Sequence, residues 1–211
     1  KAIGWEKLAT YWMHTGFVET ENEKMSKSLG NFSLAKDVID VFGAKTVRFW
    51  LLSVHYSQPL TFTEKILEEE KQIVEKIEQT IEDAQVQLKL FDYPIKKEIS
   101  SEIVYEQQKQ FKDAMDWDFN TPNAITVVHE IIKQMNIHLR QGEKSFGVLA
   151  QYLVLFQEID AVLGLQLYQE IEVDAEAKKL FQQWNSAKQD KNYQVADELR
   201  TALLTKNIRV R

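Results

Sequence analysis

The feature that most constrains the fold is residues 61–91, a stretch that contains neither glycine nor proline. Its apolar residues recur every three or four positions, which is the period of an amphipathic α-helix. The positions on this stripe are Ile66, Ile73, Ile77, Ile81, Ala84 and Leu88. A helix of this length holds its apolar stripe out of water only against other helices, so the sequence predicts a helical bundle.

Three more amphipathic stretches follow, at residues 101–115, 121–140 and 144–163, with short connections between them. Gly142 and Gly164 come directly after the second and third of these, as expected for helix ends. With only 7 Gly and 3 Pro in 211 residues, long helices are favoured over a turn-rich β fold. We therefore predict a mainly α chain built around an antiparallel four-helix bundle.

Side-chain types also suggest where two of these helices begin. The sequence Thr61-Phe62-Thr63-Glu64 fits a capping box with Thr61 as N-cap. Thr121 followed by Pro122 suggests an N-cap with proline at the first helical position.

The two ends of the chain differ from the bundle. Aromatic and β-branched residues in 8–19 suggest strand material that leads into a polar loop over 20–32. At the other end, residues 174–189 and 193–205 predict a helical hairpin. The last apolar residues, 208–210, suggest the start of a strand.

The charge is distributed unevenly along the chain. The net charge is −6, but residues 61–173 carry 11 basic and 21 acidic side chains, whereas residues 174–211 carry 8 basic and 5 acidic ones. An acidic surface repels a polyphosphate, so the final segment is the better candidate for nucleic acid. The absence of Cys excludes disulfides and thiolate metal sites and favours a cytoplasmic setting. No apolar run is long enough to predict a transmembrane helix.

The stretch from Glu23 to Asn31 carries the clearest chemistry. Lys24 and Lys27 are three residues apart on a short loop and can point at one anion, and Ser26 and Ser28 can donate hydrogen bonds to phosphate oxygens. A cationic loop of this kind suits nucleotidyl transfer, because it stabilises the charge that grows on departing pyrophosphate. The alternative is an exposed basic loop without a role.

This loop resembles the signature loop of the class I aminoacyl-tRNA synthetases at every position. Four further stretches resemble the cysteinyl-tRNA synthetases, in the same order as in that family. They are residues 11–16, residues 44–49 together with 53–56, residues 114–122, and residues 196–200 together with Asn207 and Ile208. The chain departs from the family at Gly43, where an acidic residue is usual, and at Ser57, where arginine is usual.

The resemblance implies the end of a Rossmann-type catalytic domain over 1–60, a DALR-type helical bundle over 61–170, and the start of an anticodon-binding region over 171–211. It implies an enzyme that joins cysteine to tRNA(Cys) with ATP. Lys24 and Lys27 would bind the triphosphate as catalytic residues, and Ser26 and Ser28 would assist. His14 would contact adenosine, or else only hold the strand end.

Two features of the family are missing from this sequence. These are the His-Ile-Gly-His nucleotide motif and the Cys, His and Glu ligands of a zinc ion that selects cysteine. Zinc is therefore expected in a longer parent enzyme but not here, and we do not expect this chain to activate cysteine alone. One rival, a mycothiol-pathway cysteine ligase, would lack the segment at residues 196–200. The other rival is an RNA-binding module without catalysis.

Several single residues have two interpretations. Arg48 could reach a tRNA phosphate, although an ion pair on the helix surface is favoured. Asp116, Asp118 and Asn120 could form an acidic metal loop, but the following Thr-Pro favours a turn that starts a helix. Trp184 could clamp RNA with neighbouring lysines, but burial in the hairpin core is favoured. Three aromatic residues are expected to pack in the core or between domains: Trp50, Trp117 and Phe119.

Overall fold

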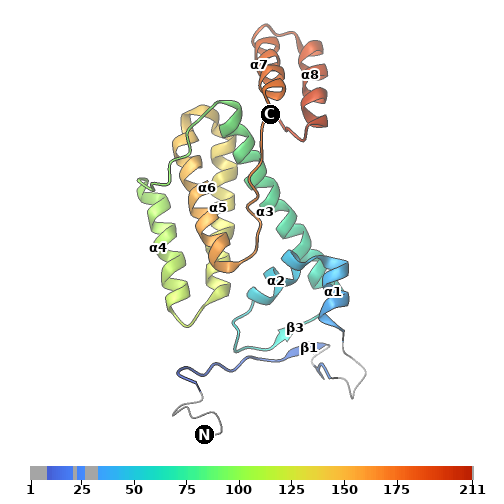
Figure 1. Ribbon diagram of the computed structural model, residues 1–211, viewed down its shortest axis with the longest axis vertical. Helices are drawn as coiled ribbons and strands as arrows, with labels where there is room; N and C mark the ends of the chain where they lie inside the picture. Colours follow the sequence, from blue (N-terminus) through green and yellow to red (C-terminus); the bar gives the residue numbers. More distant parts are fainter. Residues whose placement is uncertain (1–8, 21–22, 27–32, 211) are drawn as a thin grey trace.

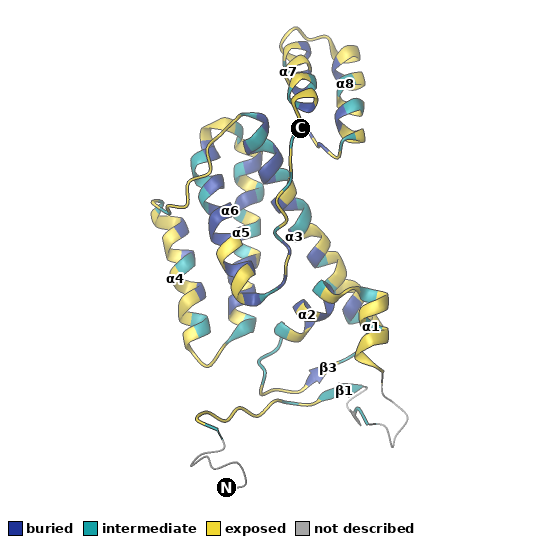
Figure 2. Cartoon of the chain, viewed as in Figure 1, coloured by how far each residue is buried: buried dark blue, intermediate teal, exposed yellow. Residues whose placement is uncertain are grey.

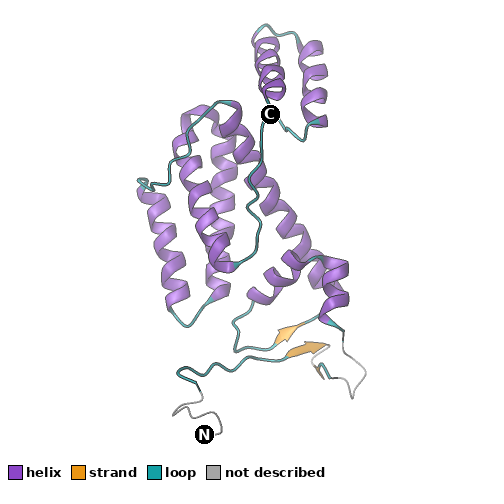
Figure 3. Ribbon diagram, in the orientation of Figure 1, coloured by secondary structure: helices purple, strands orange, loops and turns teal. Residues whose placement is uncertain are grey.

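The computed structural model describes residues 9–20, 23–26 and 33–210. Most of the described chain is helical, and its short strands lie together near the N-terminal end (Figure 3). A bundle of long helices occupies the middle, and a separate helical hairpin lies at the opposite end from the strands (Figure 1). The mainly α class predicted from the sequence is confirmed.

A small three-stranded sheet supports the first part of the chain. It consists of β1 (Val18–Thr20), β2 (Glu23–Lys24) and β3 (Leu60–Thr61), in the order β2-β1-β3. The pairing is antiparallel between β1 and β2 and parallel between β1 and β3. The sequence placed strand material too early, since within residues 9–20 the strand begins only at Val18. It missed β2 and β3, because two residues are too few to show an alternating pattern.

Two short helices connect the sheet to the bundle. They are α1 (Ala35–Phe42) and α2 (Ala44–Leu52), and Gly43 turns the chain between them with φ of 85°. Glycine adopts this positive φ without strain, which explains why residue 43 is a glycine. Val47 and Trp50 pack in a small core with Leu60 and Leu67, and so attach α2 to the sheet and to the start of the next helix.

The long helix is α3 (Glu64–Leu90), and its N-cap is Thr63 instead of the predicted Thr61. The Thr63 hydroxyl accepts a hydrogen bond from the Ile66 amide at 3.1 Å. Thr61 cannot serve as the cap because its backbone pairs with Glu19 in the sheet. The sequence therefore found the helix but not its first residue.

The bundle consists of α3, α4 (Glu102–Asp116), α5 (Thr121–Gln141) and α6 (Phe146–Leu163), with the short 3-10 turn η2 (Gly142–Ser145) between the last two. All four helices contribute buried residues to one hydrophobic core, and Figure 2 shows buried stretches on the helices of the bundle. The most deeply buried include Ile77, Ile81, Ile131, Met135, Tyr152 and Phe156. The predicted antiparallel bundle is confirmed.

One stretch of the bundle, residues 121–163, is apolar and long enough to cross a membrane by length and composition. However, 61% of its most apolar window is buried inside the protein. Its apolar residues therefore form the core of the bundle, as in other proteins whose central helices are covered on most sides.

The C-terminal ends of α5 and α6 agree with the sequence, but the start of α5, like that of α3, does not. Gly142 and Gly164, with φ of 68° and 64°, follow α5 and α6 as predicted. The start of α5 is shifted by one residue, since the N-cap is Asn120, whose side chain accepts from the Asn123 amide at 3.1 Å. Thr121 is thus the first helical residue. Asn is at least as good a cap as Thr, which explains why the residue before Thr121 takes this position.

The segment after α6 lies along the bundle and is held there by hydrogen bonds. The Asp160 carboxylate accepts from the backbone amides of Leu167 and Tyr168 at 3.1 and 3.0 Å. The Gln85 side chain donates to the Gln169 carbonyl at 2.9 Å and accepts from the Ile171 amide at 3.3 Å. These bonds fix the path of the chain towards the final hairpin.

The hairpin consists of α7 (Ala175–Gln189) and α8 (Tyr193–Thr205), as predicted. Residues 208–210 do not form the predicted strand. Instead Ile208 and Val210 are buried against the hairpin. A strand needs a partner for its backbone, and within the described residues none pairs with this segment.

His138 gives the bundle a predicted pH dependence. Burial lowers the pKa of His138, and its Nδ1 is buried without a hydrogen-bond partner among the described residues. Because the folded pKa lies below the unfolded value of about 6.5, the unfolded state binds more protons in this range. The contribution to stability is complete above about 6.5 and declines as the pH falls below it.

We expect His138→Gln to flatten this part of the pH profile. The measurement is the free energy of unfolding in urea between pH 7.5 and 5.5, for both proteins. The wild type should lose more stability than the variant over this window. Equal losses would show that His138 does not cause the dependence.

Candidate functional site

The first half of the lysine loop is part of a β-hairpin. Lys24 lies in β2, opposite Glu19 of β1, and the Met25 amide donates to the Val18 carbonyl at 3.0 Å. Ser26 follows and is half-buried. The backbone at Lys24 is therefore fixed by strand pairing. Lys27 and Ser28 lie outside the described residues, so their convergence with Lys24 stays a prediction.

Close backbone contacts hold the strand that leads into this loop. The Gly16 amide donates to the Tyr56 carbonyl at 2.8 Å, and the Leu60 amide donates to the Phe17 carbonyl at 2.8 Å. A Cβ added at Gly16 would lie 2.0 Å from the Gln58 carbonyl oxygen, which leaves room only for glycine. His14 lies two residues earlier, with its side chain exposed. Its contact with adenosine stays a prediction.

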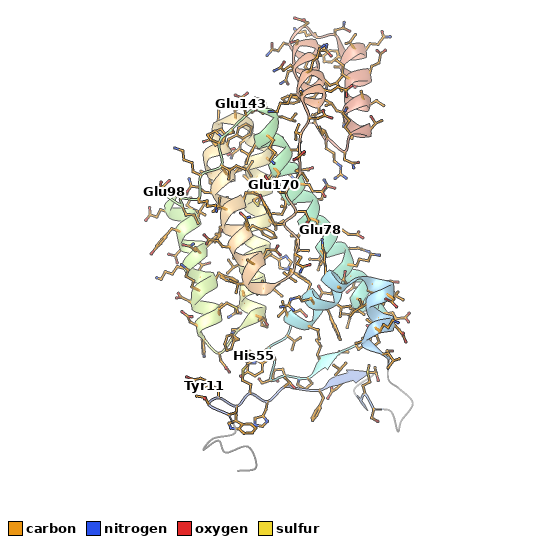
Figure 4. All side chains as sticks on the ribbon, in the orientation of Figure 1. Tyr11, His55, Glu78, Glu98, Glu143 and Glu170 are labelled. Carbon is orange, nitrogen blue, oxygen red and sulfur yellow. The ribbon has the colours of Figure 1, made fainter. Side chains whose placement is uncertain are left out.

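A hydrogen-bonded group at His55 joins this region to the bundle (Figure 4). The His55 Nε2 lies 2.9 Å from the Asp118 carbonyl oxygen, and Nδ1 lies 2.8 Å from the Ser57 hydroxyl. Because a carbonyl oxygen only accepts, Nε2 carries the proton and Nδ1 accepts from Ser57. Tyr56 donates to the Asp118 carboxylate at 2.8 Å, and this bond raises the pKa of Tyr56. Ser57, where the family usually has arginine, thus helps to fix the histidine.

The partner of this group is the turn between α4 and α5. Asp118 and Phe119 both have φ of 53°, a conformation that non-glycine residues adopt only when other contacts hold it. The prediction of a turn that starts a helix is confirmed. Among the described residues, no group of three His, Cys, Asp or Glu side chains could hold a metal ion.

The three aromatic residues predicted to pack in the core or between domains differ in their solvent exposure. Trp50 is buried as predicted, and its indole N–H donates to the Thr61 carbonyl at 3.2 Å. Trp117 and Phe119 are 75% and 53% exposed, so neither packs in a core of the described chain, and core packing was wrong for both. They flank a tight turn, where the backbone directs their side chains away from the bundle core.

Arg48 has a different role from the two that its sequence position suggested. Its Nε donates to the Leu163 carbonyl at 2.6 Å, at the C-terminal end of α6. The guanidinium also lies beside Gly164, where an added Cβ would be 2.8 Å from it. A cation at a helix C-terminus is favoured by the helix dipole. Lys45 adds an ion pair to Glu78 at 2.5 Å, so α2 is tied to both α6 and α3.

We expect Arg48→Met to destabilise the protein by about 1 kcal/mol, because it removes a charge-assisted hydrogen bond from a partly exposed site. The measurement is the midpoint of urea unfolding. Lys65→Met is the matched control, since Lys65 is exposed and pairs only at 3.9 Å with Glu69 on its own helix. A loss for Arg48→Met no larger than for the control would contradict the assigned role.

Trp184 lies in the core of the hairpin, as favoured from the sequence. It is 6% exposed and stacks on Phe181 with ring centroids 5.8 Å apart. Lys188 lies over the indole, with Nζ 4.3 Å from the ring centroid. The ring faces are therefore covered by neighbours.

The sequence reasoning did not identify His55 and Ser57 as a connection to the bundle. Residues 53–56 were noted only for their resemblance to the cysteinyl enzymes. No local pattern could reveal their partner, because Asp118 is 63 positions away from His55 along the chain.

Comparisons with known proteins agree on one family. A model described as "tRNA synthetases class I (C) catalytic domain" matches residues 1–72, and a model of the DALR domain matches residues 110–168. Proteins named "Cysteine--tRNA ligase" match almost the whole chain. The one from Shouchella clausii is 39% identical over 99% of this chain, and the one from Exiguobacterium sp. is 36% identical over 100%. The chain covers 45% and 46% of these relatives.

A solved structure shares the fold. It is a ternary complex of Agrobacterium radiobacter K84 agnB2 LeuRS with tRNA and LeuAMS, with a TM-score of 0.58 and 23% identity. The match covers 72% of this chain and 20% of that one. At this identity it shows the fold alone. Together the sequence relatives favour the cysteinyl interpretation over the mycothiol-pathway ligase and the non-catalytic module.

Proposed function

We propose that this chain supplies the ATP-phosphate loop and a tRNA-contacting helical region to a cysteine--tRNA ligase. The chain belongs to the cysteinyl-tRNA synthetase family and matches the C-terminal portion of those enzymes. The reaction of that enzyme is the activation of cysteine by ATP to cysteinyl-adenylate, followed by transfer to tRNA(Cys). The observation that carries the proposal is the match along 99% of this chain to a ligase of which the chain spans about half.

The loop acts on the first half-reaction. The carboxylate of cysteine attacks the α-phosphorus of ATP, the bond to the β-phosphate oxygen breaks, and pyrophosphate leaves with its electron pair. Lys24 and Lys27 hold the triphosphate and stabilise the growing charge, and Ser26 and Ser28 donate hydrogen bonds to phosphate oxygens. His14, in the segment before β1, contacts the adenosine. The paired backbone at Lys24 supports this role, because it fixes one end of the loop.

Zinc does not fit this part of the chain. The sequence has no Cys, and the described residues offer no group of three metal-ligating side chains. We propose that the zinc that selects cysteine in the family is bound by the portion of the relatives that this chain does not span. The reaction is cytoplasmic, and its partners are ATP, cysteine and tRNA(Cys).

Cysteine-dependent exchange of pyrophosphate into ATP, together with charging of tRNA(Cys), tests the proposal. The longer protein encoded by the same reading frame should perform both reactions, with serine in place of cysteine as the control. The 211-residue chain should perform neither alone. A longer protein that exchanges pyrophosphate with cysteine but charges no tRNA would refute the proposed tRNA ligase activity.

A further inference from the structure

The connection between α2 and β3, residues 53–59, lies between the lysine loop and the bundle. None of these seven residues is buried, so apolar packing contributes little to the path of the segment. The elements on either side of it are attached to a small core through Trp50 and Leu60. The position of the connection itself therefore depends on its hydrogen bonds, which run in two directions.

In one direction the connection is bonded to the turn between α4 and α5, at the end of the bundle nearer the strands (Figure 1). The Tyr56 hydroxyl donates to the Asp118 carboxylate at 2.8 Å, and the His55 Nε2 donates to the Asp118 carbonyl at 2.9 Å. The other carboxylate oxygen of Asp118 lies 3.7 Å from the same His55 nitrogen. A single residue of the bundle thus holds two successive side chains of the connection.

In the other direction the connection is bonded to the strand that leads into the loop. The Tyr56 carbonyl accepts a hydrogen bond from the Gly16 amide at 2.8 Å. Two residues after Gly16, the Val18 carbonyl accepts from the Met25 amide at 3.0 Å, inside the lysine loop. Tyr56 therefore contacts Asp118 through its side chain and the strand that holds the loop through its backbone.

The turn that carries Asp118 favours a role beyond stability. Asp118 and Phe119 both have φ of 53°, a conformation that costs free energy for residues with a side chain. The Asp118 side chain is 61% exposed, and polar contacts at exposed positions stabilise a fold only modestly. A costly backbone conformation that serves weakly stabilising bonds indicates that the position of the bonded segment matters.

We propose that Asp118 is a positioning residue for the lysine loop: through Tyr56 and Gly16 it fixes the strand pair that carries Lys24, and so sets where the loop meets the triphosphate of ATP. This inference rests on the proposed function, which assigns the triphosphate to this loop. It gives the helical bundle a part in the activation of cysteine, because a change at the turn of the bundle reaches the loop through a short series of hydrogen bonds.

The test measures cysteine-dependent exchange of pyrophosphate into ATP by the longer enzyme. Asp118→Gly removes the carboxylate, and glycine adopts the positive φ of the turn without strain. This variant should raise the KM for ATP and lower kcat/KM for ATP about tenfold, because small misplacements of groups that bind a reacting substrate are costly. The KM for cysteine should change little. A loss of folded enzyme would lower kcat and leave both KM values unchanged.

Two further substitutions at Asp118 and Tyr56 isolate the contact. Asp118→Asn keeps an oxygen that accepts from Tyr56, so it should retain most of the wild-type activity. Tyr56→Phe removes only the hydroxyl, and it should shift the same parameters in the same direction by about threefold. Asp116→Ala is the matched control, since it removes an exposed carboxylate at the end of α4, and it should behave as the wild type does.

A second background separates positioning of the loop from other effects. In an enzyme that already carries Lys24→Ala, Asp118→Gly should cost only about threefold, because one of the two lysines that depend on the connection is gone. The same tenfold loss in both backgrounds would show that Asp118 acts elsewhere in the enzyme, and would overturn the proposal.

Hydrogen exchange of the same proteins reports on the connection without any activity. The amides of Gly16 and Met25 should exchange faster in Asp118→Gly and Tyr56→Phe than in Asp116→Ala. Equal rates in folded variants would overturn the proposal, and the proposed function would stand. A wild-type enzyme without cysteine-dependent pyrophosphate exchange would refute the proposed function, and with it the role of this connection towards ATP.

Discussion

Replacing Gly16 with alanine is expected to separate the strand that leads into the lysine loop from its partner segment. The new Cβ would lie 2.0 Å from the carbonyl oxygen and 2.3 Å from the carbonyl carbon of Gln58. Both are backbone atoms, so no side chain can rotate away to make room. The backbone has to move, and the hydrogen bond from the Gly16 amide to Tyr56 breaks with it.

The cost should be at least about 3 kcal/mol, the upper end for overpacked sites. Hydrogen exchange is the suitable measurement, because the sheet can open locally while the bundle stays folded. The amides of Leu60 and Phe62, which donate to the strand after Gly16, should exchange much faster in the variant.

Gly147→Ala is the matched control for this substitution. Gly147 lies within α6, and an added Cβ would meet only the Tyr93 hydroxyl, at 3.2 Å. That hydroxyl is the end of a side chain and can shift, and alanine favours a helix over glycine. The control should be neutral or stabilising. Unchanged exchange at Leu60 and Phe62 in Gly16→Ala would contradict the close packing described for this strand.

In the longer enzyme, Lys27→Ala is expected to lower the rate of cysteine-dependent pyrophosphate exchange by roughly 100-fold or more. Removal of one preorganised donor to developing charge has about this effect. The KM for cysteine should change little, because the lysine is proposed to bind phosphate and not the amino acid. Lys24→Ala should have a similar effect, since the two lysines are proposed to hold the same triphosphate.

Lys36→Ala is the control for the loop variants, because Lys36 is an exposed lysine in the first turn of α1, close to the loop in sequence. It should exchange pyrophosphate at the normal rate. Normal exchange by Lys27→Ala would refute the assigned role of the loop. A matching loss in Lys36→Ala would indicate a general effect of positive charge instead of a specific contact.

The sequence predicted the helices well because each one carries its own evidence. The apolar stripe of α3 and the glycines after α5 and α6 are local features, and they hold in the structure. The exact first residues were harder to predict. Thr61 and Thr121 were good caps by type, but Thr63 and Asn120 take the position. Thr61 is instead engaged in the sheet, which is a contact with a distant segment.

In the candidate site, too, some features could be predicted from the sequence and others only from the structure. The types and spacing of Lys24, Ser26, Lys27 and Ser28 suit a phosphate-binding loop, and the resemblance to the class I synthetases favoured this interpretation over an exposed basic loop without a role. The structure adds that Lys24 lies in a paired strand and that Gly16 admits no side chain. Neither could be deduced beforehand, because β2 and β3 are two-residue strands without a periodic pattern.

The sequence by itself determined the helical class of this protein and most of its helix ends, because these depend on neighbours within a few residues. Only the tertiary structure decided which distant groups meet. It placed Arg48 at the end of α6 and His55 against Asp118. Such contacts depend on how packed helices are oriented, and a local pattern carries no information about the partner on the other side.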